Sequence, residues 1–472
     1  MYLLSKTANC RFIQFGQFQN LVVSCILFCC PGIYLAVTGL GAGGGHPSTF
    51  HLADVTNTLL YALYALFGWL GGPLLKLLGP RWALAVGATG YPMYIGGLWF
   101  YDRTGKQGFP IFTGAYLGVA AGLLWSATAY VGLAYSCQHQ KSLFVSTQWT
   151  ILALGSTVGS LIAFGLNYHS KSTGVPEAVY IIFIIIMFMA VLLATFFVKD
   201  PSSVKKSDGS FALPPSQVIL VEELRGLIAA AKDWRLLVLL PSAFISQSTV
   251  AWQSHLNSYY FSLRTRSLNN VLYWSIQLFL PYLFTAVLDA KRFPRRKRGL
   301  IGLSIQAIIL IVSFSGELAW ILKNKIDLTN TSPSLDWTDH GYGKAIVLYL
   351  LMGVQYCSSV VSVQWCVSLL VNNPTMYASY AGLYKGTQAA GMCVSFGIDA
   401  GGVSFKNQAI IYLVFMIVLS FSQLSITAVY GKESSVTEEE PLESPIVIEG
   451  SDIPLNMSSY ESEKKENLES SL

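Results

Sequence analysis

The chain has 472 residues, of which 53% are hydrophobic and 12% are charged. Soluble domains carry about twice that charged fraction, so the composition excludes an ordinary water-soluble protein. The net charge of +5 comes from basic loops, and no basic stripe with interleaved aromatic residues indicates a nucleic-acid partner.

About twelve apolar stretches follow one another from Phe12 to Tyr430. A helix rises about 1.5 Å per residue, so roughly 20 apolar residues cross about 30 Å of hydrocarbon. Because lipid offers the backbone no hydrogen-bond partners, such stretches must form helices. The sequence therefore predicts an all-α protein of the lipid bilayer. The expected transmembrane helices cover residues 15–40, 51–72, 82–101, 110–135, 144–166, 177–198, 235–258, 268–289, 299–321, 343–370, 375–398 and 407–429.

The basic residues of the loops predict the orientation of the chain. Lys and Arg number 20 in the loops on the side of both termini and 9 in the loops on the other side. Since basic loops stay in the cytosol, we expect both termini there. The first apolar stretch is too long for the hydrophobic region of a cleavable signal peptide, so we expect it to be retained as the first span.

The longest internal loop, 199–234, divides the expected helices six and six. Its amphipathic stretch, 218–232, predicts a helix on the membrane surface. Faint echoes between the halves, such as Gly79-Pro80-Arg81 and Phe293-Pro294-Arg295, favour a duplicated six-helix unit with its site at the midplane. The expected parts are a cytosolic N-terminus at 1–14, a six-helix bundle at 15–198, a cytosolic linker at 199–234, a second bundle at 235–429 and a disordered acidic cytosolic tail at 430–472.

One loop on the outer side carries a glycosylation signal. The sequon Asn330-Thr331-Ser332 lies in the loop 322–342, on the side of the membrane where glycans are added. Pro333 follows directly and weakens the motif. Asn330 is therefore the expected glycosylation site.

Lys385 lies near the middle of the eleventh expected helix. A charge at such a position costs about 2.5–3.5 kcal/mol even on mild insertion scales. Lys385 is therefore expected to face a cavity, a partner acid or backbone carbonyl groups. The alternative is snorkelling, in which the methylene groups carry the ammonium toward the interface. In a two-repeat bundle its expected neighbours are Asp54, Asn57 and Tyr61.

The seventh and tenth expected helices carry amide and aromatic side chains at helical spacing. Such groups orient a solute while the wall around them stays apolar. The alternative is hydrogen bonding between helices, worth about 0.6 kcal/mol on average in membranes. No second histidine has a spacing that makes His255 a metal ligand, so neither a metal nor a cofactor is expected. The expected cavity residues are Asn57, Tyr61, Trp125, Gln247, Trp252, His255, Gln355, Lys385 and Gln388.

The acidic residues of the apolar stretches lie near the ends of the expected helices, and Glu317 is expected at the membrane interface. Proton-coupled carriers need an ionisable relay deep in the membrane. The sequence therefore favours uniport, weak coupling or no transport at all. The acidic residues in question are Asp54, Glu177, Asp289, Glu317 and Asp399.

Several strings of residues carry a family likeness. They are LGPR at 78–81 followed by GATGYPMY at 87–94, GVAAGLLWSA at 118–127, FSLRTRSLNNVLYW at 261–274 and GLYKG at 382–386. In these strings the chain resembles the uncoordinated-93-like (Unc-93-like) family and its fungal branch, over about residues 18–429. The resemblance implies the major facilitator fold, two six-helix bundles in which helices 1, 4, 7 and 10 line a central cavity. The loop after the second helix keeps Lys76 and Arg81 but lacks the acid of the superfamily's signature.

Two hypotheses of function follow. The first is a carrier of an unknown small solute that works by alternating access in the plasma membrane or a vacuolar or endosomal membrane. The second is a non-transporting protein that binds a channel or another membrane partner, because the family includes regulators and chaperones. A membrane enzyme ranks third, since no acid–base pair, nucleophile or metal set is visible.

Overall fold

The structure is a computed structural model that describes residues 15–39, 50–137, 140–167, 177–212, 220–288, 292–327, 334–370 and 377–431. These residues belong to one compact unit, Met1–Lys432. The predictions about residues 1–14, about Asn330 and about the tail beyond residue 431 lie outside the described part of the chain.

The described residues form helices, with β-pairing among them limited to isolated bridges. In the first half the elements are α2 (Gly16–Leu27), the π-helical turn η1 (Phe28–Gly32), α3 (Ile33–Gly39), α4 (Phe50–Trp69), α5 (Gly71–Thr104), α6 (Gly108–Ala134), α7 (Lys141–Asn167) and α8 (Glu177–Phe197). The turn η4 (Pro201–Ser203) and α9 (Leu220–Lys232) follow in the linker. In the second half they are α10 (Trp234–Ser246), α11 (Thr249–Tyr260), α12 (Leu263–Ile276), α13 (Leu280–Leu288), α14 (Arg295–Asn324), α15 (Tyr342–Leu370), α16 (Tyr377–Ala400) and α17 (Phe405–Tyr430).

Nine helical segments of the described chain are long and apolar enough to cross a membrane. The pair α4 and α5, bent by 87° where they meet, makes ten if it is counted as one span. α16 has 24 residues, but Lys385, Gln388 and Asp399 lower its hydropathy. The chain is therefore a multi-pass membrane protein, and the count of twelve stays a prediction.

The outward faces of α8, α14 and α17 are apolar. Ile185 and Phe188 on α8, Val312 on α14 and Phe421 on α17 are more than half exposed. A water-soluble protein rarely exposes such continuous apolar surface, whereas a helix in lipid requires it. The buried side of the same helices therefore holds whatever polar chemistry the protein has.

Several helices are interrupted along their length. Pro31 lies in η1, where the π-helical turn accommodates a residue that has no N–H to donate. Gly79 has φ +73° and ψ 159°, a conformation open to glycine, and it divides α5 at the predicted loop. Gln247 separates α10 from α11, and Gln277 ends α12 ahead of α13. The polar sequence around Gln247 thus breaks the seventh expected helix instead of continuing it.

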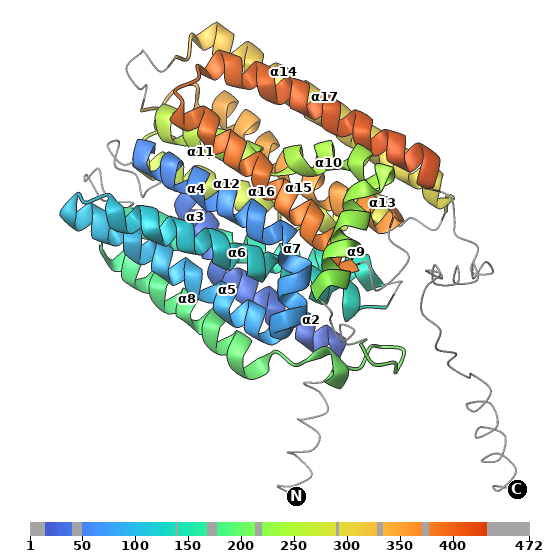
Figure 1. Cartoon of the computed structure of the whole chain (residues 1–472). Helices are drawn as coiled ribbons and strands as arrows, with labels where there is room; N and C mark the ends of the chain where they lie inside the picture. Colours follow the sequence, from blue (N-terminus) through green and yellow to red (C-terminus); the bar gives the residue numbers. More distant parts are fainter. Residues whose placement is uncertain are drawn as a thin grey trace, which may run out of the picture. The chain divides into compact units, whose positions relative to one another are not determined.

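The two halves of the chain meet most extensively along two pairs of helices, α4 with α16 and α7 with α12. Figure 1 shows α4 and α16 side by side, with α8 and the pair α14 and α17 at opposite edges. A Cβ atom built on Gly68 would lie 2.9 Å from the Gly386 Cα, and one on Gly382 would lie 2.9 Å from the Gly68 carbonyl oxygen. Only glycine permits backbones to approach this closely.

Contacts with the linker identify one end of the bundle. The Gly16 N–H at the start of α2 donates to the Lys205 carbonyl oxygen (2.9 Å). The Tyr135 hydroxyl, directly after α6, donates to the Lys199 carbonyl oxygen (3.0 Å). The Tyr380 hydroxyl near the start of α16 donates to the Asp233 carboxylate. We call this the linker end.

The opposite end carries the connection between α14 and α15. The Tyr259 hydroxyl at the end of α11 donates to the Asp327 carbonyl oxygen (2.5 Å), and the Ser262 N–H donates to the Leu335 carbonyl oxygen (3.0 Å). We call this the loop end. A helix, or a pair of helices joined at a break, that starts at one of these ends finishes at the other, so its two ends can be assigned to a side.

Candidate functional site

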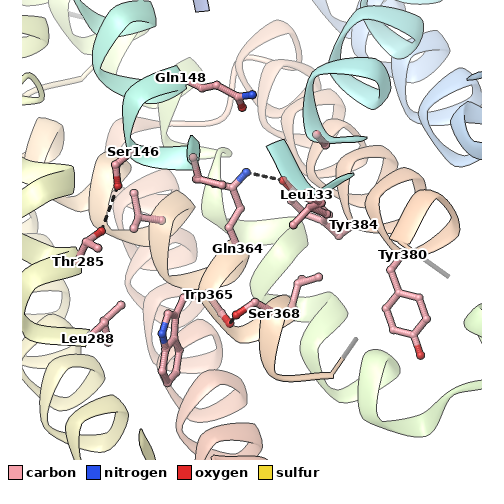
Figure 2. Close-up of a pocket in the computed structure, with 14 residues that line it drawn as sticks. Leu133, Ser146, Gln148, Thr285, Leu288, Gln364, Trp365, Ser368, Tyr380 and Tyr384 are labelled. Carbon is pink, nitrogen blue, oxygen red and sulfur yellow. Dashed lines mark hydrogen bonds between the residues drawn. The ribbon is translucent and has the colours of Figure 1, made fainter. Parts of the chain in front are cut away.

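A cavity of about 70 Å³, counted as space open to the centre of a water molecule, lies between the halves near the linker end. Its walls come from the ends of α6, α13 and α15 and the starts of α7 and α16 (Figure 2). The Gln364 side-chain N–H donates to the Tyr384 hydroxyl (2.7 Å). The Ser146 and Thr285 hydroxyls, from opposite halves, lie 3.1 Å apart. We call this the outer cavity.

A second cavity of about 20 Å³ continues inward from the outer cavity. The two share the walls formed by Ala129, Val145, Gln148 and Gln364. Lys385 lines the second cavity, which we therefore call the lysine cavity.

The Lys385 side chain is 2% exposed, and its ammonium faces aromatic rings. The nitrogen lies 4.8 Å from the ring centroid of Trp125 and 4.9 Å from that of Tyr384. Among the described residues no carboxylate forms an ion pair with it. Of the three environments expected for Lys385, the structure places it at a cavity. Its ammonium does not reach the membrane surface by snorkelling.

A third cavity of about 30 Å³ shares Trp125 with the lysine cavity. Tyrosines from α3, α4, α5 and α15 surround it, together with Gln247. The ring of Tyr61 stacks on Phe396 with centroids 5.5 Å apart and planes at 6°. We call this the tyrosine cavity. The three cavities follow one another from the linker end into the interior.

Asn57 does not line the tyrosine cavity, but its hydrogen bonds hold tyrosine side chains beside it. Its side-chain oxygen accepts hydrogen bonds from the hydroxyls of Tyr34 (3.1 Å) and Tyr94 (2.9 Å). The Tyr34 hydroxyl lies 3.4 Å from that of Tyr61. Asn57 and Tyr61, which the sequence predicts to lie near Lys385, thus belong to one hydrogen-bond network of side chains on α3, α4 and α5.

Hydrogen bonds between the halves close the loop end. The Asn270 side chain donates to the Ala36 carbonyl oxygen and to the Ser160 hydroxyl, both at 2.9 Å. The Asn257 side chain donates to the Gly39 carbonyl oxygen (2.8 Å). The C-terminal end of α3 is thereby bonded to α11 and α12, and the three cavities lie on the other side of this seal.

The position of Glu317 differs from the one expected from the sequence. Glu317 is fully buried, not interfacial, because its face of α14 turns toward α11 and α15. The Trp252 indole N–H donates to one carboxylate oxygen (3.1 Å), and the Gln355 side-chain N–H donates to the other (3.2 Å). Two predicted cavity residues therefore hold a buried carboxyl group, and neither lines the three cavities.

His255 belongs to a second buried ionisable group. Its Nδ1 lies 2.9 Å from Asp399 Oδ1, and the Asp399 side chain is 1% exposed. Asp54, on α4 in the other half, lies close enough to interact electrostatically with both. Sequence reasoning placed these acids at helix ends and missed that the fold brings them together. Within the described ranges, no three His, Cys, Asp or Glu residues form a metal site.

The remaining candidate, Gln388, donates to the Ser246 hydroxyl (2.8 Å) between α16 and α10. That contact matches the alternative of hydrogen bonding between helices. Of the nine candidates, the structure brings Tyr61, Trp125, Gln247 and Lys385 to the walls of the three cavities. The walls of the outer cavity from α6, α7 and α13 were missed, because apart from Gln148 their side chains are hydroxyl or apolar and give no signal in the sequence.

Solved structures share this arrangement of helices. The chain resembles the E. coli fucose:proton symporter FucP, with a TM-score of 0.58, 12% identity and coverage of 86% of this chain and 97% of that chain. It also resembles the E. coli xylose transporter XylE in a partially occluded inward-open conformation, with a TM-score of 0.60, 13% identity and coverage of 86% and 95%. At this identity the likeness shows the fold alone: the chain has the helical fold of major facilitator superfamily transporters.

The family is shown by closer relatives. The family described as "Ion channel regulatory protein UNC-93" matches residues 55–254. The chain is 34% identical to UNC93-like protein 1 of Arabidopsis thaliana over 390 residues, covering 82% of this chain and 84% of that protein. It is 70% identical over 424 residues to the uncharacterized membrane protein C6F6.04c of Schizosaccharomyces pombe, covering 90% and 87%. The chain belongs to the UNC-93 family, which confirms the resemblance found in the sequence.

Proposed function

We propose that this protein is a carrier of a small solute that works by alternating access. In the proposal twelve transmembrane helices form two six-helix bundles, at 15–198 and 235–429, joined by the linker 199–234. The order of helix ends supports it: successive helices or broken helix pairs alternate between the linker end and the loop end. The buried polarity of α16 fits a helix that crosses the membrane inside a protein wall.

One observation carries the proposal. A series of three cavities leads from the linker end to buried polar residues between the halves, while the loop end is sealed by hydrogen bonds. A carrier with its site at the midplane, caught with one side closed, has this geometry. A rocking motion that breaks the bonds of Asn257 and Asn270 and closes the outer cavity would expose the same site to the other side.

Solute uptake tests the proposal. The purified protein in proteoliposomes is expected to accumulate at least one class in a panel of labelled sugars, amino acids, organic acids and organic cations. Lys385→Ala is expected to lower that flux at least tenfold. Lys406→Ala removes an exposed lysine at the start of α17 and is the matched control, with flux unchanged. Flux equal to that of protein-free liposomes for every class contradicts the proposal.

A second candidate function is favoured by the family description, which names a regulator of ion channels. In that case the protein binds a channel or another membrane partner and moves no solute. Purification in mild detergent would then yield one membrane protein in constant stoichiometry, and the proteoliposomes would show no flux. The fold and the relatives are those of transporters and regulators, so catalysis is not proposed.

The placement in the cell is also a proposal. We propose that both termini face the cytosol, in the plasma membrane or a vacuolar or endosomal membrane, and that Asn330 on the far side carries a glycan. The excess of basic residues in the loops at the linker end supports the orientation. A glycosidase-sensitive mobility shift that Asn330→Gln abolishes is expected, whereas a glycan on Asn456 in the tail would reverse the orientation.

A further inference from the structure

In the part of the chain that the structure describes, Lys385 in the lysine cavity has no acidic partner. Lys385 is 2% exposed, and within the described chain none of the residues lining the three cavities is acidic. The buried acids Glu317 and Asp399 have other hydrogen-bond partners and do not pair with it. The rings of Trp125 and Tyr384 attract the ammonium, but an aromatic quadrupole is no counter-charge.

The hydrogen bonds around Lys385 leave at least one hydroxyl donor for a ligand beside the ammonium. The Tyr384 hydroxyl accepts from Gln364, so its own hydrogen is available to a second partner. The Gln148 side-chain N–H is already used, because it donates to the Asn20 side-chain oxygen (2.8 Å) and the Thr128 carbonyl oxygen (3.3 Å). One ammonium and one hydroxyl therefore stand at the boundary between the lysine cavity and the outer cavity.

The outer cavity on the other side of this boundary is mainly apolar. Its wall includes Leu133, Leu288, Val361 and Trp365, together with the hydroxyls of Ser146 and Thr285. An apolar wall takes up a hydrocarbon or aromatic body, and a few placed polar groups fix its orientation. A ligand that fits both parts has one anionic end and one apolar end.

We propose that Lys385 and Tyr384 bind the carboxylate of an organic monoanion whose apolar body lies in the outer cavity. Two donors match the two oxygens of a carboxylate, and one ammonium balances one negative charge. A phosphate dianion would leave a net buried charge, and a cation would be repelled. The inference rests on the proposed function, for which it names the class of solute, but binding can be measured without transport.

Equilibrium binding to the full-length protein in detergent tests the inference. The probes are benzoate, its neutral counterpart benzamide and the cation benzylamine, and the signal is quenching of tryptophan fluorescence or a shift in melting temperature. Benzoate is expected to bind at least tenfold more tightly than either counterpart. Lys385→Gln is expected to abolish that preference, Lys385→Arg to retain most of it, and Tyr384→Phe to weaken benzoate binding severalfold. Lys406→Gln is the matched control and leaves all three affinities unchanged.

The outcomes separate this inference from the proposal of transport. Equal affinity for benzoate and benzamide, or a preference for benzoate that survives Lys385→Gln, overturns the anion site while leaving a carrier of neutral solutes intact. Selective benzoate binding without flux of any organic acid supports the site and removes the transport role. If Lys385→Gln is not monodisperse in size-exclusion chromatography, Tyr384→Phe decides: an unchanged benzoate affinity overturns the inference.

Discussion

The buried carboxyl group of Glu317 joins three helices of the second half of the chain. Its two carboxylate oxygens are the acceptors for the Trp252 indole and the Gln355 amide, and all three side chains are buried. A buried donor that loses its acceptor costs about 1–3 kcal/mol, so the carboxyl stabilises two helices besides its own.

Substitutions of Glu317 are therefore expected to lower the stability of the protein, and alanine is expected to lower it more than glutamine. Glu317→Gln keeps one acceptor oxygen and should cost about 1–3 kcal/mol, the penalty for one donor without a partner. Glu317→Ala removes both acceptors and leaves a cavity, so its cost should be about twice as large. Thermal unfolding in detergent measures both. A higher melting temperature for either variant would mean that the cost of burying the carboxyl exceeds the value of its hydrogen bonds.

The contrast between Lys385 and Glu317 shows what a sequence predicts about single residues. Lys385 could be predicted to face a cavity, because a charge in the middle of an apolar stretch has few stable environments. Glu317 lies seven residues before the end of α14, a position along the helix from which a side chain can reach water. Whether Glu317 is buried or exposed therefore depends only on the direction in which its side of the helix faces. That direction depends on which helices pack beside α14, which the sequence does not state.

At the scale of elements, the crossing of α4 and α16 depends on glycine. A Cβ atom on Gly386 would lie 2.3 Å from the Trp69 ring and 2.7 Å from the Ala65 carbonyl oxygen. Gly386→Ala is expected to cost about 1–3 kcal/mol or more, because the helices must separate. Gly96→Ala in α5 is the control: no atom lies within 4 Å of its Cβ position, and alanine there should be neutral or stabilising. Equal melting temperatures for the two variants would show that the close approach does not matter.

The start of α12 is fixed by an ion pair with Asp336, which lies between α14 and α15 and outside the membrane-spanning helices. Asp336 accepts two hydrogen bonds from the Arg264 guanidinium (2.7 and 2.8 Å) and one from the Ser262 hydroxyl (2.8 Å). Burial opposes ionisation of Asp336, but these hydrogen bonds outweigh it and lower the pKa of its carboxyl. A lowered pKa in the folded state stabilises the fold above the unfolded pKa of about 3.9 and loses its effect as the pH falls below it.

Asp336→Asn is expected to melt at a lower temperature than the unsubstituted protein at every pH from about 5 to 8. The difference should shrink as the pH is lowered from about 4 toward 3, because the Asp336 carboxyl group then takes up a proton in the unfolded chain but not in the folded protein. Melting curves of both proteins across this range provide the measurement. A difference in melting temperature that stays constant down to pH 3 would show that the shape of the Asp336 side chain, and not its charge, stabilises the fold.

The helices themselves were largely predictable, whereas their interruptions were not. Long apolar stretches locate the helices, because lipid leaves the backbone no alternative. The break at Gln247 replaces an expected continuous helix, although the run of polar residues around it was visible in the sequence. The start of α12 at Leu263, earlier than the expected residue 268, follows from the Ser262 side chain, which accepts from the Thr265 N–H at the helix start.

At the scale of the whole molecule, the pairing of helices decides where polar residues meet. The contacts of α4 with α16 bring Asp54 toward His255 and Asp399, and those of α7 with α13 bring Ser146 toward Thr285. Composition and periodicity predict which face of a helix is polar but not which other helix it meets. The three cavities could therefore not be located from the sequence, although Trp125, Gln247 and Lys385 on their walls were predicted to line a cavity.

The central claim is that the seal between the two halves at the loop end opens as solute passes. The Asn270 side-chain nitrogen and the Ser160 hydroxyl, 2.9 Å apart on opposite halves, mark where a reversible bond would keep that seal closed. The decisive measurement is proteoliposome flux of the double variant Ser160→Cys with Asn270→Cys, before oxidation, after it and after reduction, beside each single variant. The account predicts that oxidation stops flux in the double variant alone and that reduction restores it. Unchanged flux in protein shown by mass spectrometry to be cross-linked, or no flux in any form, would contradict it.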